Sequence, residues 1–150
     1  MFEDEDFEET QSPKIRTLKN RKQFLLLSKK GNRISTSGLV LEFAKREIFE
    51  VEESEAKKIA NDLTLNTLLD LKNSKNSPEI GFTASKKVGS AVYRNKAKRR
   101  LREAAREVLK HNPKLFKKNY KFNIIARHSA IDREFTSLVR DLKYALHNVG

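Results

Sequence analysis

The chain has 150 residues, a length typical of a single domain with a modest hydrophobic core. Its hydrophobic fraction of 37% lies below the globular norm, and its charged fraction of 35% lies above it. A sequence without cysteine excludes a disulfide framework, a thiolate zinc site and a cysteine nucleophile. No apolar stretch is long enough to predict a membrane span, and the acidic start is unlike a secretory signal. We expect a soluble, cytoplasmic protein.

Charge is segregated along the chain. Lys and Arg total 32 against 20 Asp and Glu, a formal net charge of +12. Residues 1–10 carry six acids and no base, whereas residues 11–41 carry eight bases and no acid. Residues 42–79 are net acidic, and residues 80–150 carry eighteen bases against five acids. Unopposed positive charge on this scale favours a polyanionic partner, with a nucleic acid ahead of a membrane surface.

The N-terminal part of the chain predicts a tail followed by a helix. Residues 1–13 have too little apolar content to fold, and we expect an acidic disordered tail there. A helical pattern begins at Leu18, where Asn20 is a suitable N-cap and Gly31 a suitable stop. The remaining residues, 14–150, predict one domain without internal repeats.

Beyond residue 31, predicted strands alternate with predicted helices. Strand patterns cover residues 38–43, 47–52, 80–85 and 122–126. Residues 54–71 fit one helix or two, and residues 72–78 predict a loop. A helix over residues 91–110 has an apolar stripe formed by Ala97, Leu101, Ala104, Ala105 and Val108. Asp132 is expected to cap a last helix with the apolar face Phe135, Leu138, Val139, Leu142, Ala145 and Leu146. This alternation predicts a small α/β sandwich with one core.

Nothing in the sequence favours catalysis by the chain's own side chains. His111, His128 and His147 are widely spaced and form no HExxH-type metal motif. A Gly-rich phosphate loop and a nucleophile elbow are both missing from the sequence, and carboxylates concentrate in the acidic start and the middle segment. We therefore expect no catalytic residue, no metal ligand and no cofactor-binding residue on this chain.

The densest chemical signal is the segment from Ser85 to Arg102, which holds eight bases and no acid. Lys86 and Lys87 follow a predicted strand, just before a helix start whose free amides attract phosphate. On the helix, basic side chains recur every fourth residue at Arg94, Lys98, Arg102 and Arg106. Asn95 and Arg99 lie beside this ridge, opposite the apolar stripe. Arginine binds phosphate bidentately, and asparagine can address a 2′-hydroxyl or a base edge, so the pattern predicts an RNA-binding face.

The run SKKVGSAVYRNKAKRRLREAAR resembles the signature of the bacterial ribonuclease P protein subunit, in which an Arg-Asn-x-x-Lys-Arg-x-x-Arg helix follows a Ser-Lys-Lys strand end. Residues 18–31 resemble the family's first helix, and residues 122–130 resemble its last strand. The resemblance covers about residues 16–44 and 79–148. It implies an α+β fold, an α-β sandwich in which a small mixed sheet packs with three main helices. It also implies a left-handed βαβ crossover, which general rules disfavour.

The same resemblance implies a function. In that family the RNA subunit carries the phosphodiester hydrolysis with Mg²⁺ and removes the 5′ leader of precursor tRNA. The chain would then be the accessory protein subunit of an endoribonuclease, with the catalytic RNA and precursor tRNA as partners and no membrane partner. The main alternative is a basic ribosomal or other structured-RNA-binding protein. A stand-alone nuclease is a further alternative.

Site residues follow by matching the family motif. RNA-subunit contact is implied for Arg94, Asn95, Lys98, Arg99 and Arg102, with Lys86 and Lys87 at the edge of that surface. Phe24 matches an aromatic residue of the first helix that lines a cleft for the single-stranded leader, although its helical spacing fits a core residue equally well.

This chain also departs from the family pattern. Relatives often carry two further aromatic residues near Phe24, where this sequence has Ser28 and, on the first strand, Glu42. These differences leave fewer rings and an added negative charge at the expected leader site. An insertion at about 45–78 exceeds the family's short strand connection.

Overall fold

The structure of the chain is a computed structural model that describes residues 15–18, 20–49 and 78–149. Five strands form one mixed sheet in the order β1-β4-β5-β3-β2. The strands are β1 (Arg16–Thr17), β2 (Asn32–Ser35), β3 (Leu39–Lys45), β4 (Glu79–Thr83) and β5 (Tyr120–Ala126). The main helices are α2 (Arg21–Lys30), α5 (Ala91–His111) and α6 (Phe135–His147), with short 3₁₀ turns η1 (Pro113–Leu115) and η2 (His128–Ile131). The predicted mixed sheet with three main helices is confirmed.

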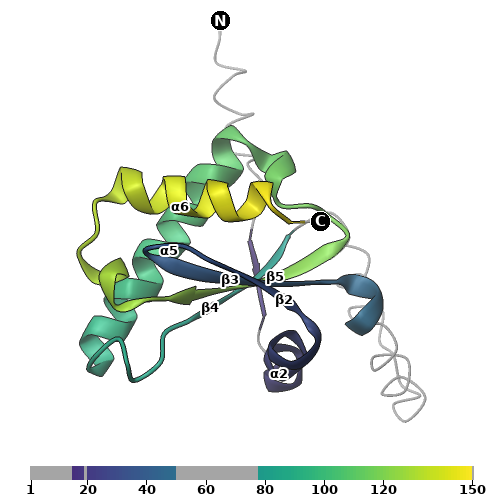
Figure 1. Cartoon of the computed structure of the whole chain (residues 1–150), viewed down its shortest axis with the longest axis horizontal. Coiled ribbons are helices and arrows are strands. Elements are labelled where there is room, and N and C mark those ends of the chain that lie inside the picture. Colours follow the sequence, from purple (N-terminus) through teal and green to yellow (C-terminus); the bar gives the residue numbers. More distant parts are fainter. Residues whose placement is uncertain (1–14, 19, 50–77, 150) are drawn as a thin grey trace, which may run out of the picture.

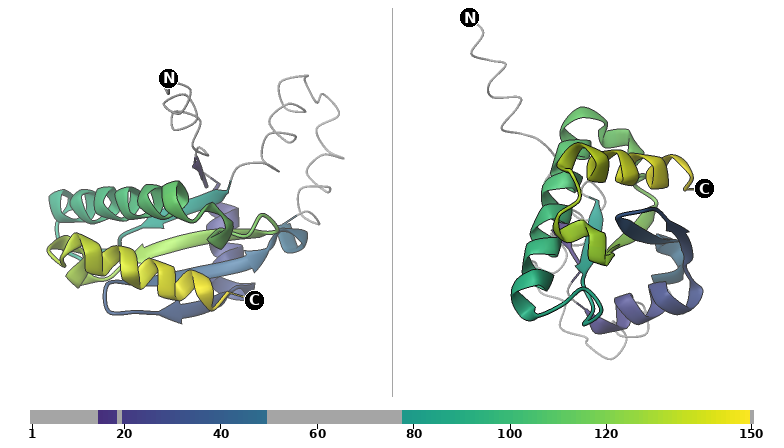
Figure 2. Two further views of the ribbon diagram at one scale, coloured as in Figure 1. Left: turned by 90° about the horizontal axis from the view of Figure 1, so that it is seen from above. Right: turned by 60° about the vertical axis from the view of Figure 1, so that its left-hand side comes forward.

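The sheet separates two unequal layers. Helices α5 and α6 pack together on one face, and α2 lies on the other (Figure 1). A view from above shows α5 and α6 side by side across the strands (Figure 2). Strand β4 pairs in parallel with β5 and connects to it through α5, whereas β3 runs antiparallel to both β5 and β2. The hand of the β4–α5–β5 crossover stays a prediction of the family resemblance.

The main hydrophobic core fills the layer beneath α5 and α6. Side chains alternate along β5, so that Phe122 and Ile124 face these helices and are fully buried. Every residue of the predicted α5 stripe is buried, and Phe116 packs edge-on against Phe122 with ring centroids 5.3 Å apart. The predicted apolar face of α6 is also buried, except for Phe135, which is partly exposed.

A smaller apolar cluster holds α2 against the opposite face. Its buried members are Leu18, Leu26, Leu27, Ala44 and Phe49, with Phe24 packed against them. The helix begins as predicted, because Asn20 Oδ1 accepts a 2.8 Å hydrogen bond from the Lys22 amide. It ends at Lys30, and the Gly31 amide donates to the Leu27 carbonyl.

Two sequence predictions are wrong. The strand expected over residues 47–52 is contradicted at residues 47–49, which are helical, and residues 50–52 lie outside the described part of the chain. Arg46 turns the chain there, donating from its backbone to Asn119 and from Nε to the Lys118 carbonyl at 2.6 Å. Asp132 does not cap the last helix, because it ends η2, and Glu134 is the N-cap of α6. Short strands β1 and β2 were not predicted, since each is too brief for an alternating pattern.

Other expectations lie outside the described residues. These are the acidic tail over residues 1–13, the helical pattern over residues 54–71 and most of the loop over residues 72–78. The predicted insertion at about 45–78 is described only at its ends. Within the described part of the chain, no helix combines the length and apolar character that crossing a membrane requires.

An ionic cluster ties together the two strand ends that flank this insertion. Glu79, at the start of β4, pairs with Lys121 Nζ at 3.1 Å and with Arg46 Nη1 at 3.3 Å. Lys121 also lies 4.6 Å above the centre of the Phe49 ring. Ala44 and Glu79 both pair with Lys121 from opposite sides of β5, so β3 and β4 are two strand spacings apart, roughly 10 Å.

Replacing residues 51–77 with a flexible linker of about six residues should therefore preserve the fold, because such a linker reaches roughly 20 Å. Loop closure depends only weakly on loop length, so we expect the free energy of unfolding to change by no more than ~1 kcal/mol. Denaturant unfolding followed by circular dichroism measures this change. Loss of a cooperative transition would show that residues 51–77 contribute to the core.

Candidate nucleic-acid interface

The turn before α5 places two lysines at the helix start. The Val88 amide donates to the Ser85 carbonyl at 3.0 Å, and the Gly89 amide donates to Lys86 at 3.1 Å. Gly89 has a φ of 142°, a conformation that L side chains rarely adopt. Lys86 and Lys87 are exposed on this turn, beside the unpaired amides of the first helical turn. The turn therefore gathers positive charge where the helix dipole already attracts anions.

Helix α5 presents the predicted basic face opposite its buried stripe. Asn95 and Arg99 are exposed, whereas Arg94, Lys98 and Arg102 are half-buried. None of these five side chains pairs with a carboxylate of residues 15–18, 20–49 or 78–149. The carboxylate of Glu107 on the same helix pairs instead with His111 at 2.8 Å. We refer to Arg94, Asn95, Lys98, Arg99 and Arg102 as the α5 basic face.

Two arginines of this face are held by the protein to different extents. The Arg102 guanidinium lies 5.6 Å above the centre of the Phe82 ring of β4, which fixes its orientation without neutralising its charge. Arg94 Nε is buried and has no hydrogen-bond partner among the described residues. A buried donor without a partner costs about 1–3 kcal/mol, so an acceptor supplied by a ligand would relieve this cost.

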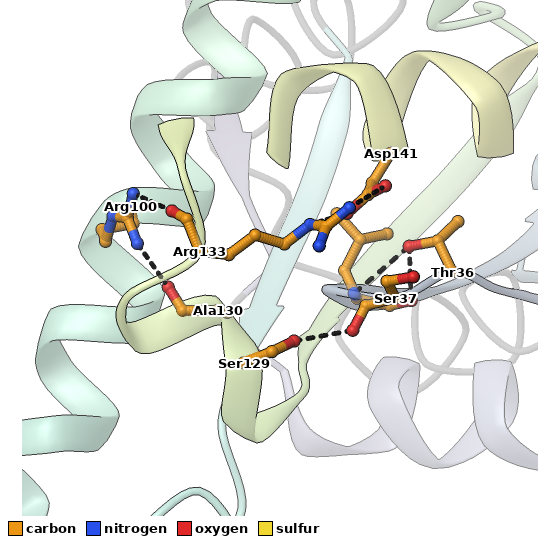
Figure 3. Close-up of polar contacts among 8 residues, drawn as sticks. Thr36, Ser37, Arg100, Ser129, Ala130, Arg133 and Asp141 are labelled. Atoms are coloured by element: carbon orange, nitrogen blue, oxygen red, sulfur yellow. Dashed lines mark hydrogen bonds and ion pairs between the residues drawn. The ribbon is translucent and has the colours of Figure 1, made fainter. Parts of the chain in front are cut away.

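Arg100 belongs to the same basic run but has a structural role. Its Nη1 donates to the Ala130 carbonyl at 3.0 Å, and its Nη2 donates to the Arg133 carbonyl (Figure 3). Arg133 in turn pairs with Asp141 of α6 at 2.7 Å, and Ser129 donates to the Ser37 carbonyl at 2.6 Å (Figure 3). These contacts join α5, the η2 turn, α6 and the β2–β3 connection. Arg100 therefore holds these elements together, whereas its neighbour Arg99 is exposed on the α5 basic face.

Phe24 lies on the α2 side of the sheet, the face opposite to α5. A Cβ atom on Gly81 of β4 would lie 2.4 Å from Cε1 of the Phe24 ring, so the ring rests directly on the glycine backbone. Phe24 is half-buried and packs against the apolar cluster under α2. This packing agrees with the core alternative that its spacing left open, and its role in a leader cleft stays a prediction.

A polar row crosses the sheet beside Phe24. The register aligns Gly81, Asn123, Glu42 and Arg33 on four neighbouring strands. Glu42 Oε2 accepts from Arg33 Nε at 2.8 Å and from Nη2 at 2.6 Å, and Glu42 Oε1 accepts from Asn123 Nδ2 at 3.2 Å. Thr83 Oγ1 donates to Asn123 Oδ1 at 3.0 Å. We call Arg33, Glu42, Asn123 and Thr83 the polar row.

Strand β4 connects the two surfaces. Phe82 lies under Arg102 on the α5 side, and its neighbour Gly81 lies under Phe24 on the α2 side. The structure thus groups the predicted α5 residues with Lys86 and Lys87, and places Phe24 separately, one strand residue away on the other face. Sequence analysis missed Arg33, Asn123 and Thr83. These residues come from three different strands, and only the register of the sheet places them on one face. Ser28, the other family departure, is exposed.

Among the described residues, no three His, Asp or Glu side chains gather into a group that could hold a metal ion. The molecule is a small α+β protein with one acid-poor, arginine-rich helix face and one aromatic and polar sheet face. That combination is typical of a nucleic-acid-binding protein.

Comparison with known proteins identifies the family. The family model described as Ribonuclease P matches residues 13–150. A ribonuclease P protein component from Gluconacetobacter diazotrophicus is 32% identical over 133 residues, covering 89% of this chain and 90% of that protein. One from Caulobacter vibrioides is 51% identical over 67 residues, covering 45% of this chain and 43% of that protein. The chain therefore belongs to the ribonuclease P protein family.

Solved structures show the same fold. The RNase P protein from Thermotoga maritima superposes with a TM-score of 0.59 at 21% identity, covering 90% of this chain and 98% of that one. The RNase P protein from Staphylococcus aureus gives a TM-score of 0.56 at 21% identity, covering 89% of this chain and 94% of that one. The predicted resemblance and function class are confirmed, namely a protein component of the tRNA-processing ribonucleoprotein ribonuclease P.

Adjacent arginines on α5 should respond differently to removal. Arg99→Ala should change the free energy of unfolding by no more than about 0.5 kcal/mol, because Arg99 is exposed and bonded to no described residue. Arg100→Ala should cost about 1.5–3 kcal/mol, since two carbonyls lose a charged donor. Denaturant unfolding of both variants measures the difference. Equal effects would contradict the structural role of Arg100.

Proposed function

We propose that this chain binds the catalytic RNA subunit of ribonuclease P through the α5 basic face. The observation that carries the proposal is that five polar or basic side chains on one helix face pair with no carboxylate of the described residues. Arginine forks and the helix N-terminus are suited to the phosphates of a folded RNA, and Asn95 to a 2′-hydroxyl. Lys86 and Lys87 extend the same surface at the start of the helix.

The proposal assigns a second RNA surface to the α2 side of the sheet. Phe24 is half-buried on this side, and its ring is the group on which an unpaired base of the precursor tRNA leader would stack. One departure from the family pattern, Glu42, affects this site less than its residue type suggests. Glu42 adds no unpaired negative charge, because Arg33 neutralises it at 2.6 Å.

In this proposal the RNA subunit carries the phosphodiester hydrolysis and its Mg²⁺, and the protein is the accessory subunit of a cytoplasmic bacterial endoribonuclease. The protein contributes affinity and placement of the leader, not a reacting group. A precursor tRNA cleavage assay at low magnesium tests this division. Cleavage should require the RNA subunit and increase when the protein is added. Cleavage by the protein alone would support the stand-alone nuclease instead.

Removing an arginine from the α5 basic face should weaken assembly with the RNA subunit. Arg99→Ala and Arg102→Ala should each cost about 1.5–3 kcal/mol of binding free energy, the value of a hydrogen bond to a charged group. Arg140→Ala on α6 is a matched control for Arg99→Ala, because Arg140 is also exposed and lies on another helix. Filter binding or calorimetry with the RNA subunit measures the affinities. Unchanged affinity in both α5 variants would overturn the assignment.

Removing the Phe24 ring should affect leader recognition and leave assembly intact. Phe24→Ala should reduce precursor tRNA binding by the assembled enzyme by roughly 1–3 kcal/mol, with mature tRNA binding unchanged. It should also lower stability by about 1–3 kcal/mol, less than the loss of a fully buried Phe, because the ring is half-buried. Phe24→Leu keeps the packing without the ring and separates the two effects. If both variants still bind precursor tRNA more tightly than mature tRNA to the same extent as the unsubstituted protein, Phe24 has only a packing role.

A further inference from the structure

The Arg33–Glu42 pair is asymmetric in its exposure. The Glu42 side chain is 2% exposed, whereas the Arg33 side chain is 57% exposed. Both contacts from Arg33 use Nε and Nη2 and converge on the single oxygen Oε2. Nη1 makes no hydrogen bond to any described residue. One edge of the guanidinium is thus anchored, and the opposite edge is presented to solvent.

Glu42 itself is held from both sides. Its second oxygen accepts from Asn123, and Asn123 accepts from Thr83, so the carboxylate is fixed by contacts from strands β2 and β5. A buried carboxylate held in this way restricts the position of the arginine that pairs with it. The buried carboxylate of Glu42 therefore orients the exposed side chain of Arg33 at the edge of the sheet.

Arg33 lies in line with Phe24 across the sheet. The register aligns Gly81 beneath the Phe24 ring with Asn123, Glu42 and Arg33 on successive strands. Three strand spacings separate the two ends of this row, roughly 14 Å. Asn123 and Glu42 between them are buried, so an RNA strand with a base stacked on Phe24 would have to pass over this row to bring a phosphate to the exposed side chain of Arg33.

We propose that Arg33 is a phosphate-binding residue for single-stranded RNA on the α2 side of the sheet, and that Glu42 is its positioning residue. The proposal rests on the assignment of the leader to this side. A guanidinium already bonded to a carboxylate retains free N–H donors, and fixing it beforehand reduces the entropy lost when RNA binds. The ligand chemistry is a phosphodiester of an unpaired strand.

The decisive variant replaces both members of the pair. Arg33→Gln with Glu42→Gln leaves the net charge unchanged and leaves no buried carboxylate without a partner. The matched control is Arg133→Gln with Asp141→Asn, which neutralises the ion pair on the α6 side in the same way. Each doubly substituted protein is assembled with the RNA subunit, and binding of precursor and mature tRNA is measured across a series of salt concentrations.

The pair variant should lose about tenfold in precursor tRNA affinity, as expected for a hydrogen bond to a charged group. The slope of log affinity against log salt should become shallower by about 0.7, the value for one phosphate of a single strand. The affinity of the pair variant for mature tRNA should be unchanged. The control variant should bind both precursor and mature tRNA as the unsubstituted protein does. Unchanged precursor affinity and slope would overturn the proposal.

The positioning role of Glu42 has its own readout. Glu42→Gln raises the net charge by one unit, so long-range electrostatics alone would strengthen RNA binding. If Glu42 orients Arg33, precursor affinity should instead fall by a few-fold, because the arginine is no longer fixed before binding. If Glu42→Gln binds precursor tRNA as tightly as the unsubstituted protein, or more tightly, then Glu42 does not position Arg33.

Phe24→Ala, measured in parallel, separates this inference from the proposed function. If Phe24→Ala abolishes the preference for precursor tRNA and the pair variant does not, only the Arg33 inference fails. If Phe24→Ala and the pair variant both retain the full preference, the leader does not bind this side of the sheet.

Discussion

The alternation of side chains along the central strand β5 is the constraint on which both surfaces depend. Phe122 and Ile124 enter the core beneath α5 and α6, whereas Asn123 between them enters the polar row on the opposite face. Because successive side chains point to opposite faces, a shift of one residue in register would exchange the core with the polar row. Hydrophobic packing on one side therefore fixes the geometry of the hydrogen bonds on the other.

Core packing on one side of helix α5 likewise determines where its basic residues lie. Its stripe of small and branched residues sets the rotation of the helix against the sheet, and that rotation decides the task of each arginine. Arg99 is left exposed, while Arg100 is turned toward the η2 turn and bonded to two carbonyls. The basic face is thus a product of core packing as well as of composition.

The sequence was informative where periodicity was strong. The stripes of α5 and α6 and the Asn20 cap were predictable, because each follows from a local pattern. Pairing across strands was not predictable, since Arg33, Glu42 and Asn123 are brought together only by the sheet register. The pattern of residues 47–52 predicted a strand, but residues 46–49 are helical, because the contacts of Arg46 with Lys118 and Asn119 before β5 override the local pattern.

The unequal burial of Arg33 and Glu42 also restricts how this protein can change over evolutionary time. If Arg33 were lost first, a carboxylate with a 2% exposed side chain would keep only its bond to Asn123, which is strongly destabilising. If Glu42 were lost first, an arginine that is already 57% exposed would simply turn toward water. Exchange of this pair for another residue combination therefore has a favoured order, with the strand β3 position changing before the strand β2 position.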